Sequence, residues 1–163
     1  MSLRAVLTTL FLLAAPALAQ APAAPADPAA GSVILLERGA CEARCAVYRV
    51  VIFADGTVLY HGRYFVHHAG VVKSGISVES LNKLLADIDA SGFFSLENNY
   101  GYPDRSHCDS FEAGEPSAIL TVSSNGRSKT IRHNHGCAFA ASAQLTAIED
   151  KIDKAVGTSK WIK

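Results

Sequence analysis

The chain has 163 residues, and its 15 lysines and arginines balance its 15 aspartates and glutamates, so the formal net charge at pH 7 is zero. This balance excludes a strongly basic protein, and we therefore predict no nucleic-acid partner. Four cysteines in a chain of this size are typical of an exported domain that is stapled by two disulfides.

The first 19 residues have the pattern of a cleavable signal peptide. Arg4 precedes an apolar run over residues 5–15, and Ala17-Leu18-Ala19 supplies the small residues that a signal peptidase recognises. The run is much shorter than the roughly 20 residues that cross a bilayer, and no later run approaches that length, so we expect no transmembrane segment. Cleavage after Ala19 predicts a periplasmic or secreted protein.

Residues 20–31 are mostly alanine and proline, which predicts a disordered leader because this composition cannot bury a core. Residues 32–163 have the length of one folded domain. We expect a monomer or a weak oligomer that carries no cofactor.

Residues 41–65 predict the central hairpin of this domain. Two segments rich in Val, Ile, Tyr and Phe flank Asp55-Gly56, a dipeptide typical of tight hairpin turns. A two-residue loop there predicts pairs Phe53 with Val58, Val51 with Tyr60 and Val47 with Tyr64 on one face, and Ile52 with Leu59, Val50 with His61 and Tyr48 with Arg63 on the other. Both faces are largely apolar, so we expect cover on each side of the sheet, with a polar rim at Tyr48, His61 and Arg63.

The remaining elements follow from hydrophobic spacing and turn residues. We predict strands over 32–37 and 71–76, a helix over 78–91 with Ser77 as its N-cap, and a helix over 144–156 that Gly157 ends. A second hairpin turns at Asn125-Gly126 and pairs Leu120 with Ile131, Val122 with Lys129, Thr121 with Thr130 and Ser123 with Ser128. The fold class is α+β, an antiparallel sheet of two hairpins and short flanking strands with two amphipathic helices packed on it.

Four cysteines allow three pairings. We favour Cys41 with Cys45, which are close in sequence but lack the redox-active Cys-x-x-Cys spacing. Cys108 with Cys137 would then close a loop of about 30 residues, which the chain-entropy model values at roughly 3.5 kcal/mol. That second bridge would also staple the long irregular segment 97–116.

The first hairpin also carries a family pattern: Cys41, Cys45 and Tyr48 precede a strand, a Gly-centred turn, and a strand with Tyr60 and Gly62. It resembles the bacterial family called domain of unknown function 6438, whose signature is Cys-x-x-x-Cys-Pro-x-Tyr followed by two such strands. The similarity continues at Gly92-Phe93-Phe94, Pro116-Ser117, Ile131-Arg132-His133, Gly136, residues 148–153 and Trp161. The resemblance implies the fold and an exported location, and it brings no established activity.

Two positions depart from the family pattern. Ala46 replaces the proline that usually follows the second cysteine, and Gly114 stands where the family tends to have an aspartate. A chemical role of that aspartate would therefore be absent here.

One candidate site is a zinc-type metal centre. His133 and His135 point to the same side of a strand, and we expect Cys137 nearby, with His107 and Cys108 brought close by the loop. Imidazoles and thiolates are ligands for zinc and similar metals. The alternative is that the two thiols form a disulfide, which an oxidising compartment favours.

An enzyme is a further alternative, as a hydrolase with an unrecognised site. The acid-base candidates are Tyr48, His61 and Arg63 in the hairpin, and Asp104, His107 and Asp109 in the loop. No recognised nucleophile, phosphate-loop or His-Glu-x-x-His motif accompanies them. Asp104, Asp109 and Glu112 also lack the spacing of an EF-hand calcium loop.

The favoured interpretation is a non-catalytic binding or structural module of the cell envelope, with a protein or peptide as partner. Tyr100, Tyr102 and Phe111 would anchor that partner if the long loop is the binding surface, and the polar hairpin residues would add to it. The alternative is that these aromatics hold the loop on the core. On the last helix, we expect Glu149, Asp150, Lys151, Asp153 and Lys154 to form a solvated face, and Trp161 to cover a helix end.

Overall fold

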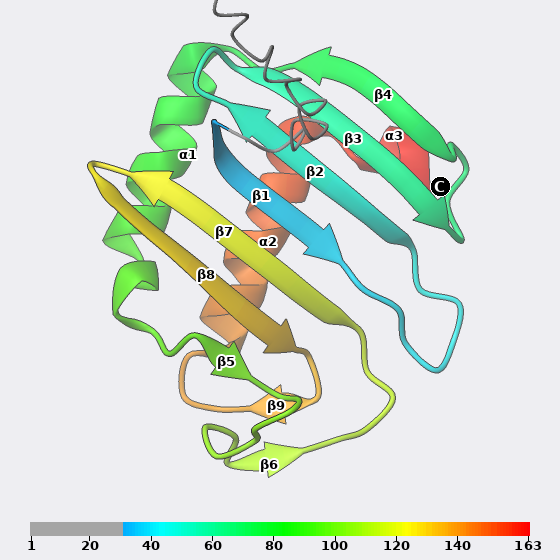
Figure 1. The fold of residues 1–163 in the computed structure, drawn as a ribbon, viewed down its shortest axis with the longest axis vertical. Coiled ribbons are helices and arrows are strands. Elements are labelled where there is room, and N and C mark those ends of the chain that lie inside the picture. The colour runs from blue at the N-terminus through cyan, green and yellow to red at the C-terminus, as the bar shows by residue number, and fades with distance from the viewer. Residues whose placement is uncertain (1–30) are drawn as a thin grey trace, which may run out of the picture.

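The computed structural model describes residues 31–163. The predicted signal peptide and all of the predicted leader except Gly31 lie outside the described residues. The described chain is α+β, as predicted: a mostly antiparallel sheet carries the helices on one face (Figure 1).

Seven strands form the main sheet, in the spatial order β4-β3-β2-β1-β7-β8-β5. Their bounds are β1 Ser32–Arg38, β2 Val47–Phe53, β3 Thr57–Tyr64, β4 Gly70–Gly75, β5 Asn99–Tyr100, β7 Ser117–Ser124 and β8 Arg127–Asn134. All neighbours are antiparallel except β5 and β8, which are parallel. A separate two-stranded sheet pairs β6 (Ser110–Phe111) with β9 (Cys137–Ala138).

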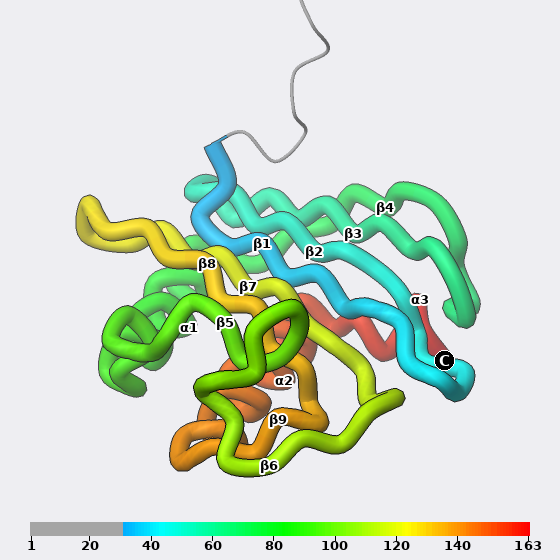
Figure 2. Tube along the Cα trace, turned by 60° about the horizontal axis from the view of Figure 1, so that its bottom comes forward, coloured from blue at the N-terminus to red at the C-terminus, as the bar shows by residue number. Residues whose placement is uncertain are grey.

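The helices are α1 (Val78–Ala90), α2 (Ser142–Val156) and the short α3 (Ser159–Ile162), with a 3₁₀ turn η1 at Phe93–Ser95. All three α-helices lie on one face of the sheet, as Figures 1 and 2 show from two directions. The core lies between the helices and the sheet, and it includes Ile34, Leu36, Leu81, Leu120 and Leu145. Cover was expected on each side of the central hairpin, and the helices supply it on one face only, where α1 and α2 contact each other (Figure 1).

The first hairpin forms, but its predicted register is wrong by one residue from Tyr48 to Ile52, whereas Val47 lies opposite Tyr64 as predicted, beyond a register shift at Tyr48. Its loop has three residues, 54–56, since the Gly56 amide donates to the Phe53 carbonyl at 2.9 Å and Gly56 adopts φ +81°. A three-residue loop that ends in a left-handed residue is a common hairpin geometry. Val50 consequently lies opposite Tyr60, not opposite His61.

This shift separates the predicted polar rim. Tyr48 lies opposite Gly62 on the helix side of the sheet and is only 5% exposed. His61 lies opposite Arg49 and is exposed, as is Arg63. A one-residue slip moves side chains to the opposite face of a sheet, so a joint site of Tyr48, His61 and Arg63 is not formed.

The second hairpin has the predicted register over its whole length. Asn125 and Gly126 have φ +52° and +72°, as a two-residue type I′ turn requires. Asp55 in the first hairpin is not left-handed, and its carboxylate instead accepts a hydrogen bond from the Thr57 amide at 2.8 Å. This hydrogen bond explains why Asp55-Gly56 lies in a three-residue loop, whereas the chemically similar Asn125-Gly126 forms a two-residue loop.

The helix signals and the cysteine pairs appear as predicted. The Ser77 hydroxyl caps α1 by accepting from the Ser80 amide, and Gly157 ends α2 in a left-handed conformation. Disulfides join Cys41 to Cys45 and Cys108 to Cys137. Among residues 31–163, no helix has the length and apolar character needed to cross a membrane.

Candidate functional site

The candidate site is centred on Glu149, a carboxylate of α2 that is buried against the sheet. Glu149 lies four residues after Leu145 and three before Ile152, both of which are buried on the sheet-facing side of the helix. It is 0% exposed, so the expectation that it belongs to a solvated charged face is wrong. Its spacing from the apolar residues was the sequence signal for burial.

Its helix neighbours differ in exposure. The side chain of Asp153, one turn further on, is mostly buried, whereas that of Asp150 is 67% exposed. Lys151 and Lys154 are exposed as predicted. The polar face of α2 therefore begins at Asp150, and Glu149 and Asp153 lie on the protein side of that boundary.

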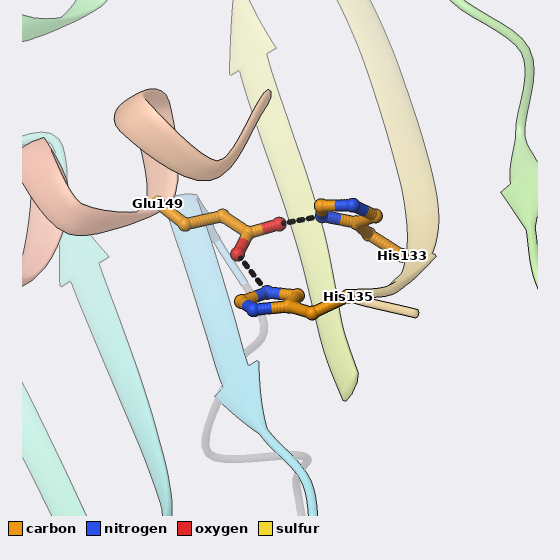
Figure 3. Close-up of side chains that lie close together, drawn as sticks. All are labelled: His133, His135 and Glu149. Atoms are coloured by element: carbon orange, nitrogen blue, oxygen red, sulfur yellow. Dashed lines mark hydrogen bonds and ion pairs between the residues drawn. The ribbon is translucent and has the colours of Figure 1, made fainter. Parts of the chain in front are cut away.

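Two histidines hold the two oxygens of Glu149 (Figure 3). His133 on β8 has its Nδ1 at 2.8 Å from Oε1, and His135, just beyond the end of β8, has its Nε2 at 2.8 Å from Oε2. The predicted alternation of His133 and His135 on a strand places both rings on the helix side, with ring centroids 4.7 Å apart. His133 is buried and His135 is partly exposed.

Arg38, the last residue of β1, completes the network. Its Nη1 donates to Oε2 of Glu149 at 2.7 Å, and its Nε and Nη2 donate to Oδ2 of Asp153 at 3.0 and 2.8 Å. Nη2 also donates to Asp150 at 2.9 Å. The guanidinium thus joins the sheet to α2 through three carboxylates.

The surroundings keep Glu149 ionised. Burial raises the pKa of its carboxyl, but hydrogen bonds from His133 and His135 and the charge of Arg38 lower it, and the net pKa lies below the ordinary value. An ionised carboxylate only accepts hydrogen bonds, so both rings present an N–H to it. In neutral His133 the proton is then on Nδ1, and its buried Nε2 has no hydrogen-bond partner among the described residues.

Arg38 and Tyr48 respond to the same carboxylates. Burial lowers the pKa of Arg38, but Asp153 and Glu149 raise it more, so the guanidinium remains charged. Burial and the nearby Asp153 carboxylate raise the pKa of the Tyr48 hydroxyl. Tyr48 is therefore part of the wall of this network, as a neutral phenol.

The structure assembles only part of the metal set expected from the sequence. His133 and His135 come together, but Cys108 and Cys137 bond to each other, which leaves no thiolate for a metal. His107 is exposed and contacts the Tyr100 ring edge-on at 6.2 Å, outside the cluster. The third ligand-type side chain at the two histidines is instead Glu149.

The loop acids do not gather into a site. Asp104 accepts hydrogen bonds from the amide and the hydroxyl of Ser106 at 2.9 and 3.0 Å, and these bonds hold its pKa below the ordinary value. Asp109 and Glu112 are exposed. Within residues 31–163, the group of potential metal ligands is the one at His133, His135 and Glu149.

The loop aromatics divide between core and surface. Tyr100 is buried and stacks on Phe139 with ring centroids 3.7 Å apart, so it holds the loop to the core. Tyr102 is 60% exposed and meets the partly exposed Phe111 edge-on at 5.2 Å. Arg105 lies over both of those rings.

Buried charges thus join the sheet to α2, and disulfides hold the loops. The protein is a small disulfide-braced α+β domain. The model of a family described as a domain of unknown function (DUF6438) matches residues 32–156, and the chain belongs to this family. A search of curated proteins found no match.

The structure explains one departure from the family pattern. Gly114 adopts φ +88°, and its carbonyl accepts a hydrogen bond from the Glu42 amide at 2.9 Å. A Cβ at this position would lie 2.7 Å from the Glu42 side chain. This backbone conformation suits glycine and would strain an aspartate at this position.

Proposed function

We propose that this protein is an exported binding module of the cell envelope, and that it binds one divalent metal ion of the zinc type through His133, His135 and Glu149. The observation that carries the proposal is the convergence of these three side chains: their ligand atoms lie within 4.8 Å of one another in a buried site. Histidine nitrogens and a carboxylate oxygen are a common ligand set for zinc.

The spacing is close to that of a metal centre. Two ligand atoms on a tetrahedral zinc ion are roughly 3.3 Å apart, given bonds of about 2.0 Å. The widest pair of ligand atoms must therefore approach by about 1.5 Å at most, whereas the nitrogen–oxygen pairs at 2.8 Å must move slightly apart. His135 can supply this shift by rotating its ring, because it lies at the partly exposed side of the site.

The charge of the network also fits a divalent cation. One guanidinium, Arg38, faces three carboxylates, those of Glu149, Asp150 and Asp153, and the two histidines are neutral when they act as ligands. Asp150 is 67% exposed, so the buried part of the network, Arg38 with Glu149 and Asp153, carries one net negative charge. Buried charge is costly unless it is compensated, so this excess favours a cation.

Arg38 is compatible with a bound metal. A carboxylate has about four lone-pair positions, so Glu149 can ligate the ion and still accept from Nη1 of Arg38. Metal-ligating carboxylates are commonly held by such outer hydrogen bonds. Arg38 would orient Glu149 and remain anchored by Asp153.

The cellular location in this proposal rests on the sequence and the cysteines. The first 19 residues have the pattern of a signal peptide, and both disulfides fit an oxidising compartment. Because the thiols are bonded, the metal site would use nitrogen and oxygen ligands only.

The test is a zinc titration of the mature chain, residues 20–163, purified without chelators. We expect about one zinc ion per chain by elemental analysis, and saturable zinc binding by calorimetry after the ion is removed. His135→Gln removes the most exposed ligand and should weaken binding by at least about 100-fold. His61→Gln changes an exposed histidine on the opposite face of the sheet and should leave binding unchanged.

Circular dichroism of each variant separates a lost ligand from lost folding. Absence of zinc from the purified protein together with no saturable binding would refute the proposal. Equal binding by wild type and folded His135→Gln would also refute it, because the ion would then sit elsewhere.

A further inference from the structure

A second feature, independent of the metal site, lies at the open edge of the sheet. β5 pairs with only the last part of β8, at Arg132 and His133. Between Arg127 and Ile131, β8 has β7 on one side and no described strand on the other. A groove of about 590 Å³ runs along this edge and is bounded by Phe94 and Asn98.

The register identifies which backbone groups face the groove. The Arg132 amide donates to the Asn98 carbonyl at 2.9 Å, so the backbone of Arg132 points away from β7. Backbone direction alternates along an antiparallel strand, and Thr130 and Ser128 therefore point the same way. Their N–H and C=O groups continue the ladder that β5 begins, and they form a template for one more strand.

The groove is lined with positive charge on both faces of the sheet. Arg132 belongs to the outer face with Thr130, whereas Lys129 and Arg127 belong to the helix side with Ile131. Arg127 forms an ion pair with Asp89 and lies over the Phe94 ring. Neither Lys129 nor Arg132 makes an ion pair with another described residue.

We infer that this edge binds an extended acidic segment of another protein, which adds a strand to β8. Side chains of an added strand alternate between the two faces, so acidic residues on one face would meet Lys129 and those on the other would meet Arg132. Main-chain hydrogen bonds to Ser128 and Thr130 supply affinity, and the charges select the partner.

A second copy of this chain is a poorer occupant. Pairing two β8 edges would bring Lys129 and Arg132 of both copies together, and like charges across a strand pair are destabilising. Charged edge residues also serve to keep sheets from associating. Partner binding and protection against sheet association can be distinguished, because only an edge that binds a partner captures an acidic strand.

The probe is a fluorescein-labelled peptide that repeats Val-Val-Glu-Glu, so that glutamates fall on both faces of the strand, with the 8-residue length of β8. A matched probe carries an N-methyl group on every backbone amide, which keeps its charge but prevents strand pairing through either edge. We expect fluorescence anisotropy to show saturable binding of the first probe only. Hydrogen exchange should slow at the amides of Ser128 and Thr130 when it binds.

Three variants separate the contribution of the backbone from that of the charges. Thr130→Pro removes the edge N–H without breaking the ladder to β7, and it should weaken binding about tenfold, whereas Thr130→Ala keeps the N–H and should bind normally. Lys129→Glu with Arg132→Glu should also weaken binding at least about tenfold. The melting temperature of each variant reports whether it folds.

The inference fails if the wild type does not bind the first probe, or if both probes bind equally, which would indicate a simple anion-binding surface. Normal binding by folded Thr130→Pro would likewise overturn it. Self-association of the charge-reversed variant without probe binding by the wild type would assign the charges to edge protection alone. None of these outcomes depends on zinc, so the metal proposal is tested separately.

Discussion

Replacing Glu149 with glutamine tests how far the fold depends on the buried network. The carboxylate accepts from three groups, His133, His135 and Arg38, at 2.7 to 2.8 Å. A glutamine amide has one acceptor oxygen, and its NH₂ group would meet a donor at the other position. The substitution therefore leaves at least one buried donor unpaired and removes the charge opposite Arg38.

The expected loss follows from these contacts. A buried hydrogen bond to a charged group contributes about 1.5–3 kcal/mol, and removal of one partner of a buried ion pair typically costs about 3–5 kcal/mol. Arg38 retains its bonds to Asp153 and Asp150, which places the loss near the lower end of that range. We predict that Glu149→Gln lowers the free energy of unfolding by about 3 kcal/mol.

The assay is urea unfolding in the presence of a chelator, so that metal binding does not contribute. Trp161 is the single tryptophan and is buried against Tyr60, with ring centroids 4.7 Å apart, so its fluorescence reports unfolding. Asp150→Asn is the matched control on the same helix, because it removes an exposed bond to Arg38 and should cost less than about 1 kcal/mol. A loss below about 1 kcal/mol for Glu149→Gln, or an equal loss for both variants, would show that the buried network does not stabilise the fold as argued.

Three further predictions concern pH and the backbone. The folded-state pKa of Glu149 lies below its unfolded value near 4.5, so its contribution to stability is present above that pH and is lost as pH falls through the folded pKa. Glu149→Gln should therefore flatten the acid limb of the curve of unfolding free energy against pH. The folded-state pKa of Tyr48 is raised above 10.0, so the contribution of its hydroxyl to stability is present below pH 10 and is lost as pH rises through the folded pKa. Tyr48→Phe should therefore lessen the decline in melting temperature at alkaline pH. Gly114→Asp should lower the free energy of unfolding by about 1–2 kcal/mol in a urea titration, because φ there is +88° and the new side chain meets Glu42. An unchanged curve in any of these cases would contradict the corresponding contact.

Most of the fold could be predicted from local features of the sequence, such as turn residues. Asn125-Gly126 specified its hairpin because both residues adopt the positive φ that a two-residue loop needs. Asp55-Gly56 forms a three-residue loop in place of the predicted two-residue loop, since the Asp55 carboxylate accepts from the Thr57 amide and only Gly56 is left-handed. The competing turn depends on one side-chain hydrogen bond, which the dipeptide alone does not indicate.

The candidate site was predictable in part for a related reason. Alternation along a strand placed His133 and His135 on one side, without any knowledge of the sheet order. Arg38 reaches the Glu149 carboxylate that these histidines hold because β1 lies next to β7 in the sheet, a long-range pairing that no local pattern encodes. Glu149 was predictable from its helical spacing to Leu145 and Ile152, although a carboxylate is ordinarily expected at the surface.

The most direct test of the metal proposal is X-ray absorption spectroscopy at the zinc edge on the zinc-loaded wild-type protein. The proposal predicts a first shell of nitrogen and oxygen at about 2.0–2.1 Å, with the outer-shell scattering of two imidazole rings. It also predicts no sulfur at about 2.3 Å, because Cys108 and Cys137 form a disulfide. A sulfur shell, or a shell with no imidazole scattering, would contradict binding at His133, His135 and Glu149.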